Sequence, residues 1–164
     1  MSSNPYDFSQ KKRVGIIGGN MPDPQSVKNA ERMGELIAQK GYILVNGGMG
    51  GVMEASARGA KSVGGLVVAI LPGRLVSEGN AYTDIAIPTG LGSMRNPLVV
   101  LNSDILVAIG GSYGTLSEIA YAQIYNRMVF GLNSWNLDHV ISLSSPEDVI
   151  SRIEHFFSQS IIGQ

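Results

Sequence analysis

The sequence contains no cysteine and carries little charge. Without Cys, the 164 residues can form no disulfide, thiolate metal site or cysteine nucleophile. Charged residues make up only 15% of the chain, and 12 basic residues against 13 acidic ones give a net charge of −1. Because the chain has no broad basic field, we expect no nucleic-acid partner.

Long apolar runs are also missing. No apolar stretch reaches the length of a membrane span and the N-terminus has no signal-peptide core, so we expect no membrane partner and a cytoplasmic location. Hydrophobic residues nevertheless make up 44% of the chain. High apolar content with low charge favours a homo-oligomer, a dimer or tetramer, in which another subunit covers part of the apolar surface.

The chain does have a repeated order of apolar run, turn and amphipathic segment. Strands are predicted at 13–17, 42–45, 66–71, 84–87, 105–109, 128–132 and 140–143. Helices are predicted at 24–40, 52–63 and 93–102, in a segment ending near 127, and after Ser145. This alternation predicts an α/β fold: a single doubly wound, Rossmann-like domain over 13–164, with a mainly parallel sheet and helices on both faces. Residues 1–12 are predicted to be a flexible lead.

Three glycine loops, at 18–19, 47–51 and 110–114, each follow a predicted strand. The carboxyl ends of parallel strands share one edge of the sheet, where ligands bind. The loop at 110–114 also opens a helix, and free N–H groups at a helix start bind phosphate. We therefore predict a phosphorylated small-molecule ligand, although each glycine pattern alone could be a tight turn. The predicted ligand contacts are Gly19, Asn20, Gly47, Gly48, Gly50, Arg95, Gly110, Gly111, Ser112, Gly114, Thr115 and Glu118.

Charge is scarce around that last loop. Between residues 88 and 126 the charged residues are Arg95, Asp104 and Glu118. An arginine can hold a phosphate, and a nearby carboxylate can act as a general base. Two structural alternatives stay open: Thr115 and Glu118 could form a capping box, and Arg95 could pair with Glu118 or Asp104 at a subunit contact.

Other side chains give weaker signals. The two histidines lack metal-ligand spacing, so no metal site is predicted. Met49, Met53 and Met94 are expected to pack within the protein and not to contact the ligand.

Two motifs carry a resemblance to a known superfamily. Arg95 matches the Arg of a Met-x-x-Arg-Lys motif, and a Pro-Gly-Gly-x-Gly-Thr-x-Glu-Glu motif is matched at Gly111, Gly114, Thr115 and Glu118. The chain resembles, from Arg13 onward, the superfamily once labelled "possible lysine decarboxylase". That superfamily contains the LONELY GUY cytokinin-activating phosphoribohydrolases and the molybdenum cofactor carrier proteins.

The chain departs from the enzyme motifs at four positions. Asn96 replaces the Lys, Gly110 the Pro, Ser112 a Gly and Ser117 the first Glu. Gly110 and the Gly-Leu-Gly-Ser segment before Arg95 are similar to the carrier proteins.

The resemblance implies a leading function and an alternative. The first is a protein that binds molybdenum cofactor, protects it and transfers it to molybdoenzyme recipients. Its phosphate would lie on the N–H groups around 111–115, Arg95 would offset its negative charge, and the 47–51 loop would let its flat pterin approach. The alternative is a nucleoside 5′-monophosphate phosphoribohydrolase, releasing free base and ribose 5-phosphate, with Arg95 and Glu118 as catalytic residues.

The residues also bear on two further functions. A nucleotide-sensing module whose helices bind a partner is neither supported nor excluded by the residues. Pyridoxal phosphate chemistry is not expected, because no lysine lies in a glycine-loop context.

Overall fold

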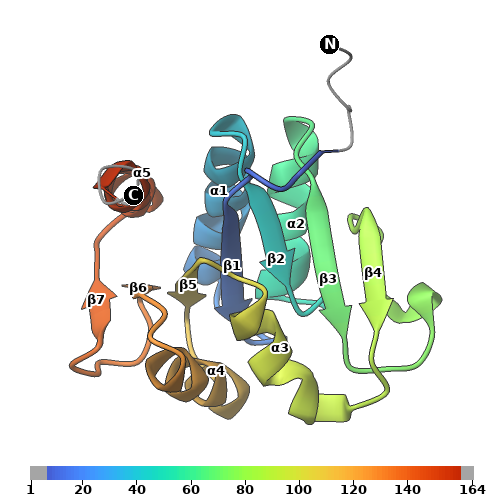
Figure 1. The fold of residues 1–164 in the computed structure, drawn as a ribbon. Helices are drawn as coiled ribbons and strands as arrows, with labels where there is room; N and C mark the ends of the chain where they lie inside the picture. Colours follow the sequence, from blue (N-terminus) through green and yellow to red (C-terminus); the bar gives the residue numbers. More distant parts are fainter. Residues whose placement is uncertain (1–6, 160–164) are drawn as a thin grey trace.

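The computed structural model describes residues 7–159 and contains a seven-stranded sheet in which every strand pair is parallel (Figure 1). The strands are β1 (Arg13–Gly18), β2 (Ile43–Asn46), β3 (Val67–Leu71), β4 (Ile85–Pro88), β5 (Ile105–Ile109), β6 (Val129–Leu132) and β7 (Val140–Ser142). The helices are α1 (Pro24–Gln39), α2 (Val52–Ser62), α3 (Asn96–Leu101), α4 (Tyr113–Ile124) and α5 (Pro146–Gln159), with short 3₁₀ helices at Val76–Glu78 and Gly92–Arg95. The predicted doubly wound α/β class is confirmed.

The strand order is β4-β3-β2-β1-β5-β6-β7, so the chain reverses its direction of travel across the sheet after β4. β5 returns to pair with the free side of β1, in a register that places Ile109 opposite Gly18. The loops that leave these two strands then run to opposite faces of the sheet. Such a switch point opens a crevice at the carboxyl ends of the strands.

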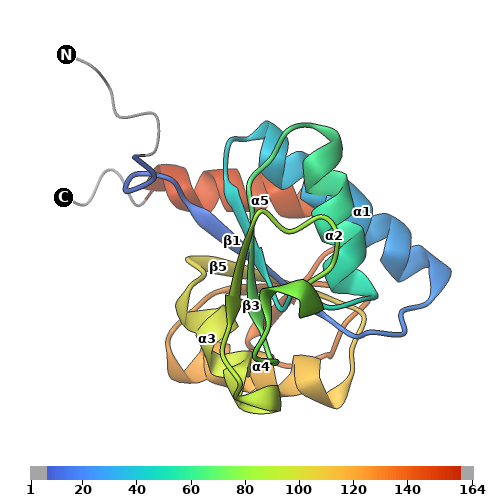
Figure 2. The ribbon, with the colours of Figure 1, turned by 90° about the vertical axis from the view of Figure 1, so that its right-hand side faces the viewer.

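Helices cover both faces of the sheet. α1, α2 and α5 pack on one face, and α3 and α4 pack on the other (Figure 2). All five residues of β5 are buried. Burial on both faces explains why the strands appear in the sequence as continuous apolar runs.

Helix starts on the site side differ from the prediction. The segment predicted as one helix at 93–102 is a 3₁₀ turn followed by α3, with Pro97 in the first turn of α3, where its missing N–H costs no hydrogen bond. α4 begins at Tyr113, so Thr115 lies inside the helix and does not cap it. The capping-box alternative for Thr115 and Glu118 is therefore wrong.

The helix predicted after Ser145 is present as α5. The backbone N–H of Asp148 donates to Ser145 Oγ at 3.1 Å, so the Ser145 side chain caps this helix. Of the predicted lead, residues 1–6 lie outside the described residues. The backbone carbonyl of Lys12 accepts a hydrogen bond from Ile43 N at 2.9 Å.

Between residues 7 and 159, no helix combines the length and apolar character that crossing a membrane requires.

The contact of α1 with α2 depends on small residues. A Cβ added to Gly34 would lie 1.9 Å from the carbonyl oxygen of Ser56. We expect Gly34→Ala to force the helices apart and lower the free energy of unfolding by about 1–3 kcal/mol, measured by urea denaturation. Gly50→Ala is the matched control, because a Cβ there meets nothing within 4 Å. Equal stability of the two variants would contradict this packing.

Candidate functional site

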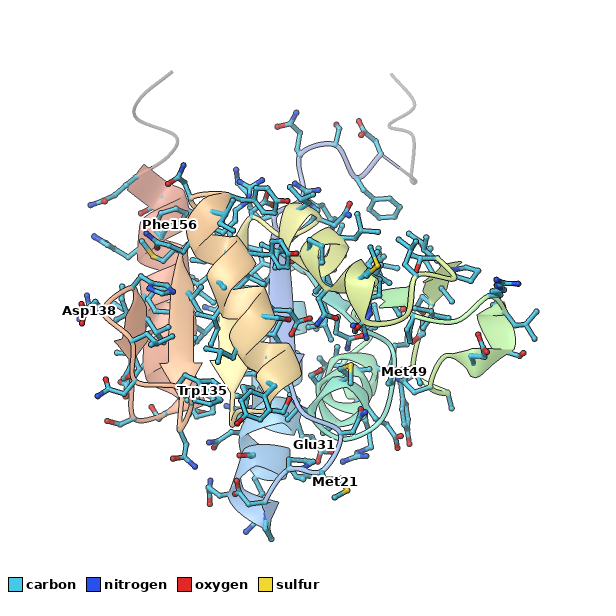
Figure 3. All side chains as sticks on the ribbon, turned by 90° about the horizontal axis from the view of Figure 1, so that it is seen from below. Met21, Glu31, Met49, Trp135, Asp138 and Phe156 are labelled. Atoms are coloured by element: carbon cyan, nitrogen blue, oxygen red, sulfur yellow. The ribbon has the colours of Figure 1, made fainter. Side chains whose placement is uncertain are left out.

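A cavity of about 270 Å³ opens at the switch point between β1 and β5. Most of the predicted ligand contacts line it: Gly19, Asn20, Gly47, Arg95, Ser112, Gly114, Thr115 and Glu118. They come from the loops after β1 and β2, from the start of α4, and from the segment that leads into α3. Figure 3 views the molecule from the cavity side and labels Met49 and Trp135 at this edge.

Four predicted contacts lie elsewhere. Gly48 has a φ of +74°, and a Cβ there would lie 2.3 Å from Leu71, so its place in the fold is structural. Gly50 is not among the residues that line the cavity. Gly110 and Gly111 line a separate hollow beside Trp135.

The cavity also has walls that the sequence did not identify. Ile16 and Ile17 form part of its lining, as do Met49 and Met53, which were expected only to pack. The position of Met49 inside the 47–51 loop was a usable signal. Ile16 and Ile17 gave no such signal in the sequence, because a residue that lines a cavity and a residue of the core are both apolar members of the same run. Asn96, a departure from the enzyme motif, also lines the cavity.

Arg95 is buried and anchored by backbone carbonyls. Its Nε donates to Ile70 O at 2.7 Å and its Nη2 donates to Gly47 O at 3.2 Å. Nη1 donates to the side-chain oxygen of Asn96. Within the chain Asp104 pairs with Arg13 at 2.7 Å and not with Arg95, and the pairing of Arg95 at a subunit contact stays a prediction.

Gly47 is required by this arrangement. A Cβ at Gly47 would lie 2.3 Å from Arg95 Nη2. The absent side chain therefore leaves room for the guanidinium to lie against the loop after β2.

Glu118 projects from α4 into the cavity and is 7% exposed. Its carboxyl makes no hydrogen bond to any residue that the structure describes. Burial raises the pKa of Glu118 from its ordinary value of 4.5 to about 8, and the positive charge of Arg95 opposes this shift. The carboxyl is therefore mostly protonated, and neutral, at pH 7.

The start of α4 offers free hydrogen-bond donors. Within residues 7–159, the backbone N–H groups of Tyr113, Gly114 and Thr115 have no partner, and Ser112 does not cap them through its side chain. Ser112 Oγ lies 3.3 Å from Thr115 Oγ1, so two hydroxyls stand beside these donors. The partial positive charge of a helix start favours an anion there.

A neutral pair joins α3 to α4. Asn96 Nδ2 donates to Ser117 Oγ at 2.9 Å, and Ser117 Oγ donates to Gly114 O at 2.7 Å. These are the two positions at which the enzyme motifs carry Lys and Glu. At these two motif positions this chain therefore has uncharged side chains, which hydrogen-bond to each other and connect α3 to α4.

Residues 11–156 match the family described as LDcluster4, the SLOG cluster4 family. The chain belongs to this family. An uncharacterized protein of Archaeoglobus fulgidus is 56% identical over 120 residues, covering 73% of this chain and 79% of that protein. A rice protein (Oryza sativa subsp. japonica), named a probable cytokinin riboside 5′-monophosphate phosphoribohydrolase, is 33% identical over 96 residues, or 55% of this chain and 42% of the rice protein. The chain therefore spans less than half of that relative.

Solved structures resemble the chain over nearly its whole length. The molybdenum cofactor binding protein of Rippkaea orientalis is 37% identical with a TM-score of 0.86, covering 90% of this chain and 98% of its own. The Moco carrier protein of Chlamydomonas reinhardtii is 29% identical with a TM-score of 0.84, covering 92% of this chain and 99% of its own. These matches confirm the resemblance to the LONELY GUY superfamily and to its carrier members.

The shifted pKa of Glu118 predicts a dependence of stability on pH. Above pH 4.5 the unfolded chain ionises this carboxyl, whereas the folded protein keeps it protonated until about pH 8. The free energy of unfolding should therefore fall as pH rises through this window, by up to about 1.4 kcal/mol per pH unit, and then level off. Glu118→Gln lacks this titration, so urea denaturation of both proteins from pH 4.5 to 9 isolates it. A constant difference between the two would show an ordinary pKa for Glu118.

Proposed function

We propose that this protein binds molybdenum cofactor, protects it and passes it to molybdoenzyme recipients. The observation that carries this proposal is the neutral pair of Asn96 and Ser117, which hydrogen-bond at 2.9 Å in place of the Lys and Glu of the hydrolase motifs. A hydrolase site needs charges placed for chemistry, whereas a carrier needs an anion site that does not react. The similarity to a cofactor binding protein and a cofactor carrier protein supports the same choice.

The raised pKa of Glu118 suits the binding of an anion. A carboxylate must be ionised to activate water, but a protonated carboxyl can act as a general acid on the leaving group, so this pKa is compatible with both carriage and hydrolysis. With its pKa raised to about 8, Glu118 is a neutral group at pH 7. A neutral carboxyl does not repel a phosphorylated ligand and can donate a hydrogen bond to it.

The cavity matches the organic part of the cofactor. Its terminal phosphate would lie on the free N–H groups at the start of α4, with Arg95 nearby to offset negative charge. Met49 and Met53 offer polarisable walls to the flat pterin. Because the chain has no Cys, it supplies no thiolate to the metal, and the cofactor is held by reversible contacts alone.

Hydrolysis of a nucleoside 5′-monophosphate is the second candidate. It is favoured by the retention of both Arg95 and Glu118 in the cavity and by the similarity to the rice protein. Incubation with AMP distinguishes the two candidates. If the wild type releases adenine and Glu118→Ala does not, the protein is a hydrolase. If the folded wild type releases no adenine, the result supports the carrier function.

Ser112→Asp tests the phosphate contact directly. The new carboxylate would cap the free N–H groups of α4, which maintains or raises the stability of the helix and repels a phosphate. We expect at least a roughly tenfold loss of affinity, since one charge-assisted contact contributes about 1.5–3 kcal/mol. The measurement loads purified protein with molybdenum cofactor and follows its decay in air by transfer to an apo-molybdoenzyme.

Ser151→Asp is the matched control for charge, because it places the same carboxylate at an exposed position of α5. The wild type and this control should slow the decay of the cofactor, and Ser112→Asp should not. If the cofactor decays equally with and without wild-type protein, carriage is excluded.

Homo-oligomerisation, as a dimer or tetramer, remains part of the proposal. Between residues 88 and 126, Arg95 and Glu118 are buried in the cavity and Asp104 pairs with Arg13, while Met94 and Ile124 are 74% and 66% exposed. An apolar surface without unpaired charge is suited to a self-complementary contact. We expect light scattering to give a mass of two or four chains, each of 17.4 kDa. A monomer at micromolar concentration would contradict this expectation.

A further inference from the structure

A second hollow, of about 360 Å³, lies beside the start of α4, on the side away from the main cavity. Gly110 and Gly111 form one wall, and the loop after β6 forms the other with Asn133, Ser134, Trp135 and Asn136. Ser112 stands between the two spaces: its side chain lines the main cavity, while its carbonyl oxygen accepts from Trp135 Nε1 at 3.2 Å. The phosphate-binding start of α4 therefore borders both spaces.

Trp135 is held with its ring against this glycine loop. A Cβ on Gly111 would lie 2.7 Å from Trp135 Nε1, so only glycine lets the indole approach this closely. Tyr113, the first residue of α4, is 83% exposed, and its ring centroid lies 6.3 Å from that of Trp135 at a tilt of 40°. The two rings contact each other, so a flat ligand would stack on their open faces and not between them. Figure 3 shows Trp135 at this edge of the molecule.

The remaining groups of the hollow are polar and uncharged. Asn133 and Asn136 are exposed, and their amides can both donate and accept hydrogen bonds. The Ser134 hydroxyl is buried without a hydrogen-bond partner among the described residues. Aromatic faces combined with amide and hydroxyl groups, and no charge, are typical of sites that bind a nucleobase.

We propose that the Trp135 hollow binds the nucleobase of a nucleotide whose phosphate lies at the start of α4. This inference rests on the proposed phosphate contact and specifies the form of the ligand. With the pterin in the main cavity and a base on Trp135, the carried cofactor is one in which a nucleoside is joined to the pterin phosphate through a pyrophosphate.

Trp135 is the single tryptophan of the chain, so its fluorescence reports on this hollow alone. The probes are GMP, which supplies a base and a phosphate, and ribose 5-phosphate, which supplies the phosphate without a base. GMP should quench the fluorescence in a saturable way, and ribose 5-phosphate should leave it unchanged. By calorimetry GMP should bind roughly five- to a hundredfold more tightly, the range for stacking of one base.

Two variants separate stacking from folding. Trp135→Leu should bring the affinity for GMP close to that for ribose 5-phosphate, without changing the latter. Because Trp135 also packs against the core, Tyr113→Ala provides an exposed alternative that keeps the fluorescent ring. It should weaken GMP binding in the same direction.

Other results would overturn the inference at different levels. Binding of GMP without quenching, at an affinity that Trp135→Leu leaves unchanged, would keep the phosphate site and remove the base site. Failure of both probes to bind the wild-type protein would remove the phosphate contact and the base site together.

Discussion

The site depends on the parallel pairing of β5 with β1. This pairing joins segments that are about ninety residues apart in the chain, and its register sets Ile109 beside Gly18. The glycine loop before α4 and the loop after β1 must then start from neighbouring points and diverge. A Cβ on Gly18 would lie 2.7 Å from the carbonyl oxygen of Ile109, so the pairing and the small residue require each other. Without this contact the start of α4 would have no cavity to face.

Arg95 then connects the β2–β3 half of the sheet to the site. Its guanidinium donates to carbonyls of Ile70 in β3 and of Gly47 after β2, while the residue itself leads into α3. These bonds fix the position of the positive charge in a cavity whose effective dielectric constant is lower than that of water. The electrostatic attraction between Arg95 and an anionic ligand is therefore stronger there than in solution. A buried cation anchored in this way contributes chiefly through its field, because only part of its donor set is free for direct contact.

The sequence was sufficient for the fold class and for much of the cavity lining, since apolar runs and glycine loops report strand ends directly. It was not sufficient where the start of a helix or the direction of a turn determines which residues line the cavity. Thr115 and Glu118 have the spacing of a capping box, but the cap position of α4 is Ser112, three residues earlier, and Glu118 lines the cavity. Gly110 and Gly111 belong to the same motif as Gly114, yet the turn before α4 directs them to the Trp135 side. Ile16 and Ile17 could not be separated from core residues, because burial against a cavity and against a helix select the same side chains.

This scaffold is similar both to a protein named a probable phosphoribohydrolase and to molybdenum cofactor carriers, and this chain departs from the enzyme motifs by the loss of charges. A Lys–Glu pair at the positions of Asn96 and Ser117 would place two opposite charges beside Glu118 and Arg95, and would change which protonation states the cavity stabilises. The neutral pair keeps the hydrogen bond between α3 and α4 and removes those charges. Burial is then free to keep Glu118 protonated, with Arg95 as the opposing influence. A site of this kind keeps its attraction for an anion and presents to it a carboxyl that burial holds in the neutral form at pH 7.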